Sequence, residues 1–268
     1  MEENIAKDIN VLSNFCGKRD LVDLTTEELK KNYSIEQADI MVLFGGSIIC
    51  GGDVIAEGIK NDIAKKYIIV GGGGHTTDAL RNEIAKQCPN IETKSLSEAK
   101  LFSKYLEHKY GLEVDYLETH STNCGNNITY LLDLLKRENI SYKSIIISQD
   151  ASMQLRMEMG LRKYVKDKII INYATYKSHV VIKNNKLVYE KEIVGMWDIE
   201  RYISLLMGEI VRLRDDENGY GPSGKNYIEH VDIPIDVEKA YKELEINFRD
   251  LIRKANPLYA SKNRITNL

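Results

Sequence analysis

The glycine-rich stretch after residue 70 is the part of this sequence best suited to holding a ligand. Residues 67–70 form a short apolar run, glycines 71–74 end it, and His75 and Thr76 lead into a helical pattern. Glycine allows a positive φ and a close approach of the backbone to a ligand, and the free N–H groups of a first helical turn attract anions. We predict a ligand loop here; the alternative is a tight connection capped by Thr76 or Asp78. The spacing does not match the dinucleotide motif G-x-G-x-x-G.

A second polar cluster, residues 119–127, is rich in hydroxyl and amide side chains, among them Ser121, Thr122 and Asn123. Such side chains hydrogen-bond a ribose, an amino acid or a carbonyl in either polarity. The alternative is a helix cap with Asx-turn chemistry. Two shorter loops have a similar position, residues 45–47 after the apolar run 38–44 and residues 149–150 after the run 144–148.

Alternating strand and helix patterns between residues 38 and 172 predict a Rossmann-like α/β fold, a parallel sheet flanked by helices. In such sheets ligands bind beyond the carboxyl ends of the strands, where the strand order reverses. All four polar loops follow predicted strands. We therefore predict that the ligand contacts come from Gly45, Gly46, Ser47, Gly71, Gly72, Gly73, Gly74, His75, Thr76, Ser121, Thr122, Asn123, Gln149 and Asp150.

Catalytic groups are harder to assign, and the candidates are Glu98, His75 and Asp150. Glu98 also fits a capping box, with Ser95 as N-cap and Glu98 at N3, whereas a general acid–base role is the other interpretation. Cys124, at a predicted helix start, is either a nucleophile with a lowered pKa or a packed side chain.

Arg156, a methionine stripe and the possible metal ligands can each be explained without a functional role. Arg156 is either half of a surface ion pair or an anion clamp, and the spacing of Met153, Met157 and Leu161 is typical of a helix core. No potential metal ligands have i, i+4 or C-x-x-C spacing, so we predict no metal; a site would need His75, Asp78 and His120. The sequence has neither a G-x-S-x-G nor an H-E-x-x-H motif.

We expect three parts along the chain: lead-in helices over residues 1–36, the Rossmann-like core over 37–192, and a mainly helical C-terminal extension over 193–268. Within the last two parts the patterns predict a hairpin turning at Asn184 and Asn185. They also predict a helix over 197–213, an exposed loop over 214–225 that is a lid or a connector, and a last helix over 237–254.

Composition excludes several classes of protein. The net charge is −3 in 268 residues and the pI is about 6.0, so no basic field favours nucleic acid or an anionic membrane. We expect no signal peptide and no membrane span, because the first ten residues carry three acids and no run of eighteen apolar residues occurs.

Four widely spaced cysteines suit a reducing cytoplasm. The expected partner is a small molecule, and the oligomeric state is left open.

Several of these motifs, together with the C-terminal tail, resemble the YdcF family. The similarity covers about residues 38–235 and is carried by the glycine loop 71–76, the S-T-N-C-G run 121–125, Gln149-Asp150 with Met153-Gln154, and a tail with Trp197, Glu200-Arg201-Tyr202 and Gly219-Tyr220-Gly221-Pro222. It implies a Rossmann-like core with a helical extension and S-adenosylmethionine as the ligand. The family's SanA- and ElyC-type relatives carry a membrane anchor, which we do not expect here. The chain departs from the pattern at residues 45–47, where glycines replace bulkier residues.

Three functions are compatible with the sequence. The first is a binding protein or methyltransferase-like enzyme for a nucleotide-type ligand, with Glu118 or Asp150 as the acid that would hold a ribose. The second is a hydrolase or transferase for a phosphorylated or cell-envelope-related substrate, using Glu98, His75 or His120 as acid–base groups. The third is a non-catalytic sensor. We favour ligand binding and leave catalysis open.

Overall fold

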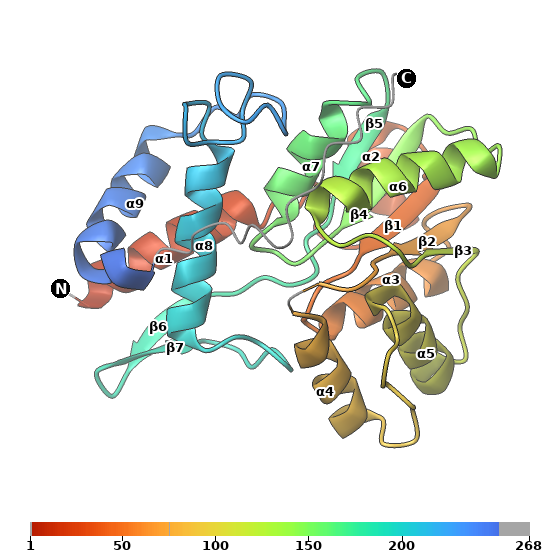
Figure 1. Cartoon of the computed structure of the whole chain (residues 1–268), viewed down its shortest axis with the longest axis horizontal. Helices are drawn as coiled ribbons and strands as arrows, with labels where there is room; N and C mark the ends of the chain where they lie inside the picture. Colours follow the sequence, from red (N-terminus) through yellow and green to blue (C-terminus); the bar gives the residue numbers. More distant parts are fainter. Residues whose placement is uncertain (1, 75, 252–268) are drawn as a thin grey trace.

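The fold is organised around a five-stranded parallel sheet with the order β3-β2-β1-β4-β5. A computed structural model describes residues 2–74 and 76–251. The protein is α/β, and the predicted Rossmann-like sheet is confirmed (Figure 1). The strands are β1 (Ile40–Phe44), β2 (Tyr67–Val70), β3 (Tyr116–Glu118), β4 (Ser144–Ser148) and β5 (Ile169–Asn172).

Helices cover both faces of this sheet, which explains why its central strands are apolar at every position. Alternate side chains of a strand point to opposite faces: Leu43 belongs to a core with Ile55 and Phe102, whereas Val42 belongs to a core with Leu131 and Met157. The first core is covered by α2 (Thr26–Tyr33), α3 (Cys50–Lys60), α4 (Thr77–Gln87) and α5 (Glu98–Tyr110), and the second by α6 (Cys124–Arg137) and α7 (Gln154–Arg162).

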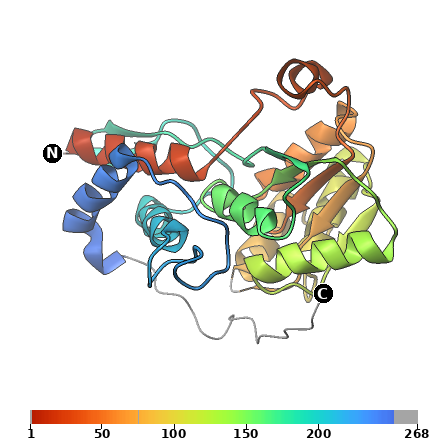
Figure 2. The same ribbon diagram turned by 90° about the horizontal axis from the view of Figure 1, so that it is seen from above.

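A separate hydrophobic core joins the two ends of the chain. Ile9 and Leu12 of α1 (Glu2–Cys16) pack with Tyr202 of α8 (Ile199–Leu213) and Leu244 of α9 (Ile235–Phe248). Figures 1 and 2 both place α1 beside α8 and α9, next to the sheet layer. The first helix is thus packed against the C-terminal extension.

The predicted hairpin is confirmed and belongs to the same core. Strands β6 (Val180–Lys183) and β7 (Lys186–Tyr189) pair antiparallel, and the two turn residues have positive φ, 52° at Asn184 and 55° at Asn185. Asparagine tolerates this conformation better than most residues, and a two-residue turn of this kind matches the twist of a hairpin.

The helix boundaries correct one prediction and leave another partly untested. Ser97, not Ser95, is the N-cap of α5, because its side chain accepts a hydrogen bond from the Lys100 N–H. Ser95 has a positive φ of 62° and Glu98 is the first helical residue, so the predicted capping box is wrong. The C-terminal helix α9 continues into a short 3-10 turn, Arg249–Leu251; the predicted residues beyond 251 lie outside the described part of the chain.

No helix in the described part of the chain is both long enough and apolar enough to cross a membrane.

Candidate functional site

A cleft lies where the sheet topology predicts a ligand site. The chain runs from β1 through β2 to β3 on one side and then to β4 and β5 on the other. The loops after β1 and β4 therefore diverge at the carboxyl ends of the strands, which is the usual ligand position in open α/β sheets. A cleft there has about 100 Å³ of room, whereas one water molecule needs only about 10–15 Å³.

Most of the predicted binding residues line this cleft. Gly71, Gly72 and Gly73 are not among the lining residues, and His75 lies outside the described residues. The predicted residues that the structure does bring together there are Gly45, Gly46, Ser47, Gly74, Thr76, Ser121, Thr122, Asn123, Gln149 and Asp150, together with the catalytic candidate Glu98.

The first glycines of the 71–74 loop pack against protein instead of facing the cleft. The Gly71 N–H donates to the Glu118 carbonyl at 2.9 Å and the Gly72 N–H to Ser121 Oγ at 3.1 Å. A Cβ on Gly71 would lie 3.0 Å from the Gly45 Cα, and one on Gly72 would lie 2.2 Å from the Ser121 carbonyl oxygen. None of the loop glycines has a positive φ. These residues are glycine because three loops pass each other closely.

This geometry predicts different effects on stability for the same substitution at two neighbouring glycines, Gly72 and Gly73. Gly72→Ala is expected to lower the free energy of unfolding by about 1–3 kcal/mol, because its Cβ overlaps backbone that must move. Gly73→Ala meets nothing within 4 Å and should leave stability unchanged or raise it by up to about 1 kcal/mol. Urea unfolding of both variants measures the difference. Equal stabilities would show that the loops do not pack in this way.

The loop after β3 is organised by Glu118. Its buried carboxylate accepts the His120 N–H at 2.6 Å and the Ser121 N–H at 3.3 Å, so it is engaged by the loop and not positioned to hold a ribose. Asn123 is the N-cap of α6 and accepts the Asn126 N–H at 2.9 Å. The capping interpretation is therefore correct for Asn123, while Ser121 and Thr122 also line the cleft.

Glu98 is a buried carboxyl group that lines the cleft. The residue is 8% exposed, and burial raises its pKa to about 7, against the smaller lowering effects of the Thr77 hydrogen bond and the Arg81 charge. Thr77 Oγ1 donates to Glu98 Oε1 at 2.8 Å, whereas Oε2 has no hydrogen-bond partner among the described residues. A carboxyl group with a pKa near neutrality can give or take a proton at physiological pH.

Asp150 is the second acid of the cleft. Ser152 Oγ and Tyr176 Oη each donate to its Oδ1 at 2.7 Å, and burial raises its pKa. Gln149 links this loop to the one after β1, because its Nε2 donates to the Gly45 carbonyl at 3.1 Å. Asp150 Oδ1 is thus saturated by the protein, and no described residue bonds Oδ2.

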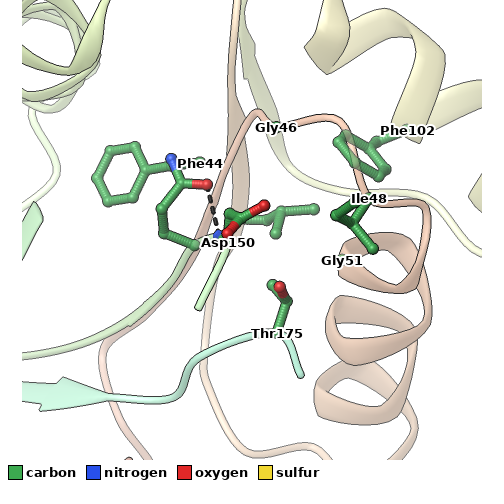
Figure 3. A pocket seen from close by; sticks show the side chains of 9 residues that line it. Phe44, Gly46, Ile48, Gly51, Phe102, Asp150 and Thr175 are labelled. Carbon is green, nitrogen blue, oxygen red and sulfur yellow. Dashed lines mark hydrogen bonds between the residues drawn. The ribbon is translucent and has the colours of Figure 1, made fainter. Parts of the chain in front are cut away.

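A smaller cavity shares Gly46, Gln149 and Asp150 with the lining of this cleft. Figure 3 shows Asp150 between Phe44 and the α3 side of the cavity, where Phe102 and Ile48 lie. The dashed line in the figure is the hydrogen bond from the Asp150 N–H to Gln149 Oε1, 2.6 Å. This cavity has about 10 Å³ of room, which is no more than one water molecule needs. It is therefore a packing defect and not a ligand site.

Several lining residues were not predicted. Trp197 and Leu205 come from the C-terminal extension, and no local pattern indicates that they reach the sheet. Met153 also lines the cleft, so the prediction that its helical stripe is core holds only for Met157 and Leu161, which are fully buried. Ser152 also lines the cleft, as do Cys124 and Asn127, which belong to the predicted polar cluster 119–127 but not to the predicted contact residues.

Arg156 is neither a surface residue nor an anion clamp. Its guanidinium forms a two-point ion pair with Glu209 of α8, and the two side chains are 12% and 4% exposed. Arg212 adds a weaker contact to the same carboxylate at 3.4 Å.

Cys124 Sγ lies 4.0 Å from Met153 Sδ. The described residues contain no group of three or more histidine, cysteine or acidic side chains arranged to hold a metal.

No model of a known protein family matches the chain. The fold and the cleft therefore carry the functional argument.

Proposed function

We propose that this protein is YdcF-like and binds a nucleotide-type small molecule, most specifically S-adenosylmethionine, in the cleft at the carboxyl ends of the strands. The observation that carries the proposal is the convergence of four predicted polar loops on one cleft at the point where strand order reverses. Ligands of open α/β sheets bind at this position.

The charge of the cleft supports this ligand over a nucleoside triphosphate. Its lining includes the carboxyl groups of Glu98 and Asp150 and, as far as the described residues go, neither lysine nor arginine. S-adenosylmethionine carries a sulfonium, an ammonium and one carboxylate, a net charge of one positive unit, whereas a triphosphate would place several negative charges beside two carboxyl groups. Met153 and Leu205 offer apolar surface for the methyl-bearing sulfur.

Titration calorimetry tests the proposal. S-adenosylmethionine is expected to bind with a micromolar Kd, S-adenosylhomocysteine more weakly because it lacks the sulfonium charge, and ATP at least about tenfold more weakly. Asp150→Asn should reduce the ratio between the affinity for S-adenosylmethionine and the affinity for ATP. Absence of heat with all three ligands, or tighter binding of ATP, would contradict the proposal.

One observation favours a second function, a hydrolase or transferase that acts on a phosphorylated or cell-envelope-related substrate. Glu98 is buried in the cleft with a pKa of about 7, as a general acid–base group requires. Methyl transfer from a sulfonium depends mainly on alignment and needs no such group.

We also propose that the protein works in a reducing cytoplasm, because all four cysteines are free thiols.

A further inference from the structure

Asn127 has an unusual environment for a buried amide. It lies in the first turns of α6, lines the cleft and is 7% exposed. Its backbone N–H donates to the Asn123 carbonyl at 2.9 Å, but its side chain has no hydrogen-bond partner in the described part of the chain. Among those residues, Ser148 Oγ is the one fully enclosed side-chain atom without a partner. The Asn127 amide therefore opens into the cleft.

An unsatisfied amide of this kind normally has a reason. Almost all buried polar side chains in native proteins have a hydrogen-bond partner in protein or water, and this amide opens into the cleft, where a bound molecule can supply one. The amide makes no side-chain hydrogen bond to the described part of the chain, and Ile128 and Leu131 of the same helix are apolar and buried. A ligand that hydrogen-bonds this amide accounts for the residue type.

The rest of the cleft indicates the shape of that ligand group. Trp197 supplies an aromatic ring to the lining, and its carbonyl accepts a hydrogen bond from Tyr189 Oη at 3.0 Å. The Arg201 guanidinium lies 5.7 Å from the centre of the Trp197 ring. Tyr189 thus fixes the backbone of Trp197, and the Arg201 guanidinium lies near its ring. An amide that both donates and accepts, in a cleft with an aromatic wall, fits a planar heteroaromatic ring with an adjacent donor and acceptor.

We propose that Asn127 recognises the hydrogen-bonding edge of a nucleobase, with the ring against Trp197. The adenine edge, an amino donor beside a ring-nitrogen acceptor, matches a carboxamide in the same way as asparagine pairs with adenine in nucleic acids. This inference rests on the proposed function and assigns the base end of the ligand to these two residues.

The stability of Asn127→Ala tests the first step. Since the side chain makes no hydrogen bond within the protein, its removal should leave the thermal midpoint unchanged. The matched control is Asn126→Ala, one position earlier. Asn126 Oδ1 accepts hydrogen bonds from Thr122 Oγ1 at 3.1 Å and Asn123 Nδ2 at 2.9 Å, so this variant should melt at a lower temperature. A fall in the midpoint for Asn127→Ala as large as that of the control would show that the amide is structural and overturn the inference.

Binding provides the second step, with two ligands and three proteins. S-adenosylhomocysteine is compared by calorimetry with its analogue that lacks the exocyclic amine of adenine. The unsubstituted protein and Asn126→Ala should each prefer the amino compound by about tenfold. Asn127→Ala should bind both compounds equally and lose about tenfold in affinity for the first. Trp197 is the single tryptophan of the chain, and both compounds should quench its fluorescence on binding.

The outcomes separate this inference from the function on which it rests. Binding of S-adenosylhomocysteine with the tenfold preference retained in Asn127→Ala would overturn the role of Asn127 and leave the proposed ligand intact. Binding without any change in tryptophan emission would remove Trp197 from the base site. If the unsubstituted protein binds neither compound, the proposed function fails, and the inference fails with it.

Discussion

Replacing Glu209 with glutamine is expected to lower the free energy of unfolding by about 3–5 kcal/mol, because it leaves buried cations without a counter-ion. Arg156 and Arg212 both contact this carboxylate, and their side chains are 12% and 11% exposed. Burial alone would lower the pKa of Arg156, but the charges around it, Glu209 among them, raise it above the usual value. Chemical denaturation measures the loss.

The effect should also reach the cleft, since the ion pair joins α7 to α8. Arg156 lies one turn after Met153, and Glu209 one turn after Leu205, and both apolar residues line the cleft. We therefore expect ligand affinity to fall together with stability.

A matched control comes from a more exposed pair. Arg214 and Glu238 lie 2.8 Å apart with side chains 25% and 30% exposed, and Glu238→Gln should cost less than about 1 kcal/mol. A loss for Glu209→Gln no larger than this would mean that the buried pair contributes little beyond a surface pair.

The sheet and its loops could be predicted from sequence because their signals are local. A strand buried on both faces is a continuous apolar run, and the run around residues 40–44 ends at glycines that the structure places in the cleft. Parallel strands bring their carboxyl ends to one edge, so four loops distant in sequence were predicted to meet, and the cleft is lined from all four.

The parts that could not be predicted depend on contacts across the chain. Trp197 and Leu205 reach the cleft because α8 packs against α1 and α9, and no spacing within residues 193–213 encodes that. Gly71 and Gly72 are needed for the close approach of neighbouring loops, a requirement that looks the same in sequence as a ligand cradle. The pattern places Glu98 two residues too far into its helix, since Ser95 and Ser97 are equivalent as caps by type alone.

Glu98→Gln is expected to remove a pH-dependent part of the free energy of unfolding. Folding raises the pKa of Glu98 from 4.5 to about 7, and a rise of this size corresponds to about 3 kcal/mol. A carboxyl group whose pKa is raised by folding binds its proton more tightly in the native state. Stability should therefore fall as pH rises from about 4.5 to about 7, and then stay level. Asp150 titrates in both proteins, so the difference between their curves isolates Glu98.

An exposed glutamate on the same helix provides the control for this measurement. The Glu107 side chain is 60% exposed and pairs with Lys104, so Glu107→Gln should shift the stability at any pH by less than about 0.5 kcal/mol. A difference between Glu98→Gln and the unsubstituted protein that does not change with pH would show that Glu98 is not buried as a neutral acid.

The same substitution separates the two proposed functions, because glutamine keeps an oxygen that can accept the hydrogen bond from Thr77 but cannot gain or lose a proton. For a protein that simply binds S-adenosylmethionine, Glu98→Gln should be more stable at pH 8 and should bind the ligand within a few-fold of the unsubstituted protein. For an acid–base enzyme, turnover of a phosphorylated or envelope-related substrate should fall by about a hundredfold or more, although the fold is more stable. A gain in stability with loss of turnover would mean that the buried carboxyl is retained for chemistry, since its burial weakens the fold at neutral pH.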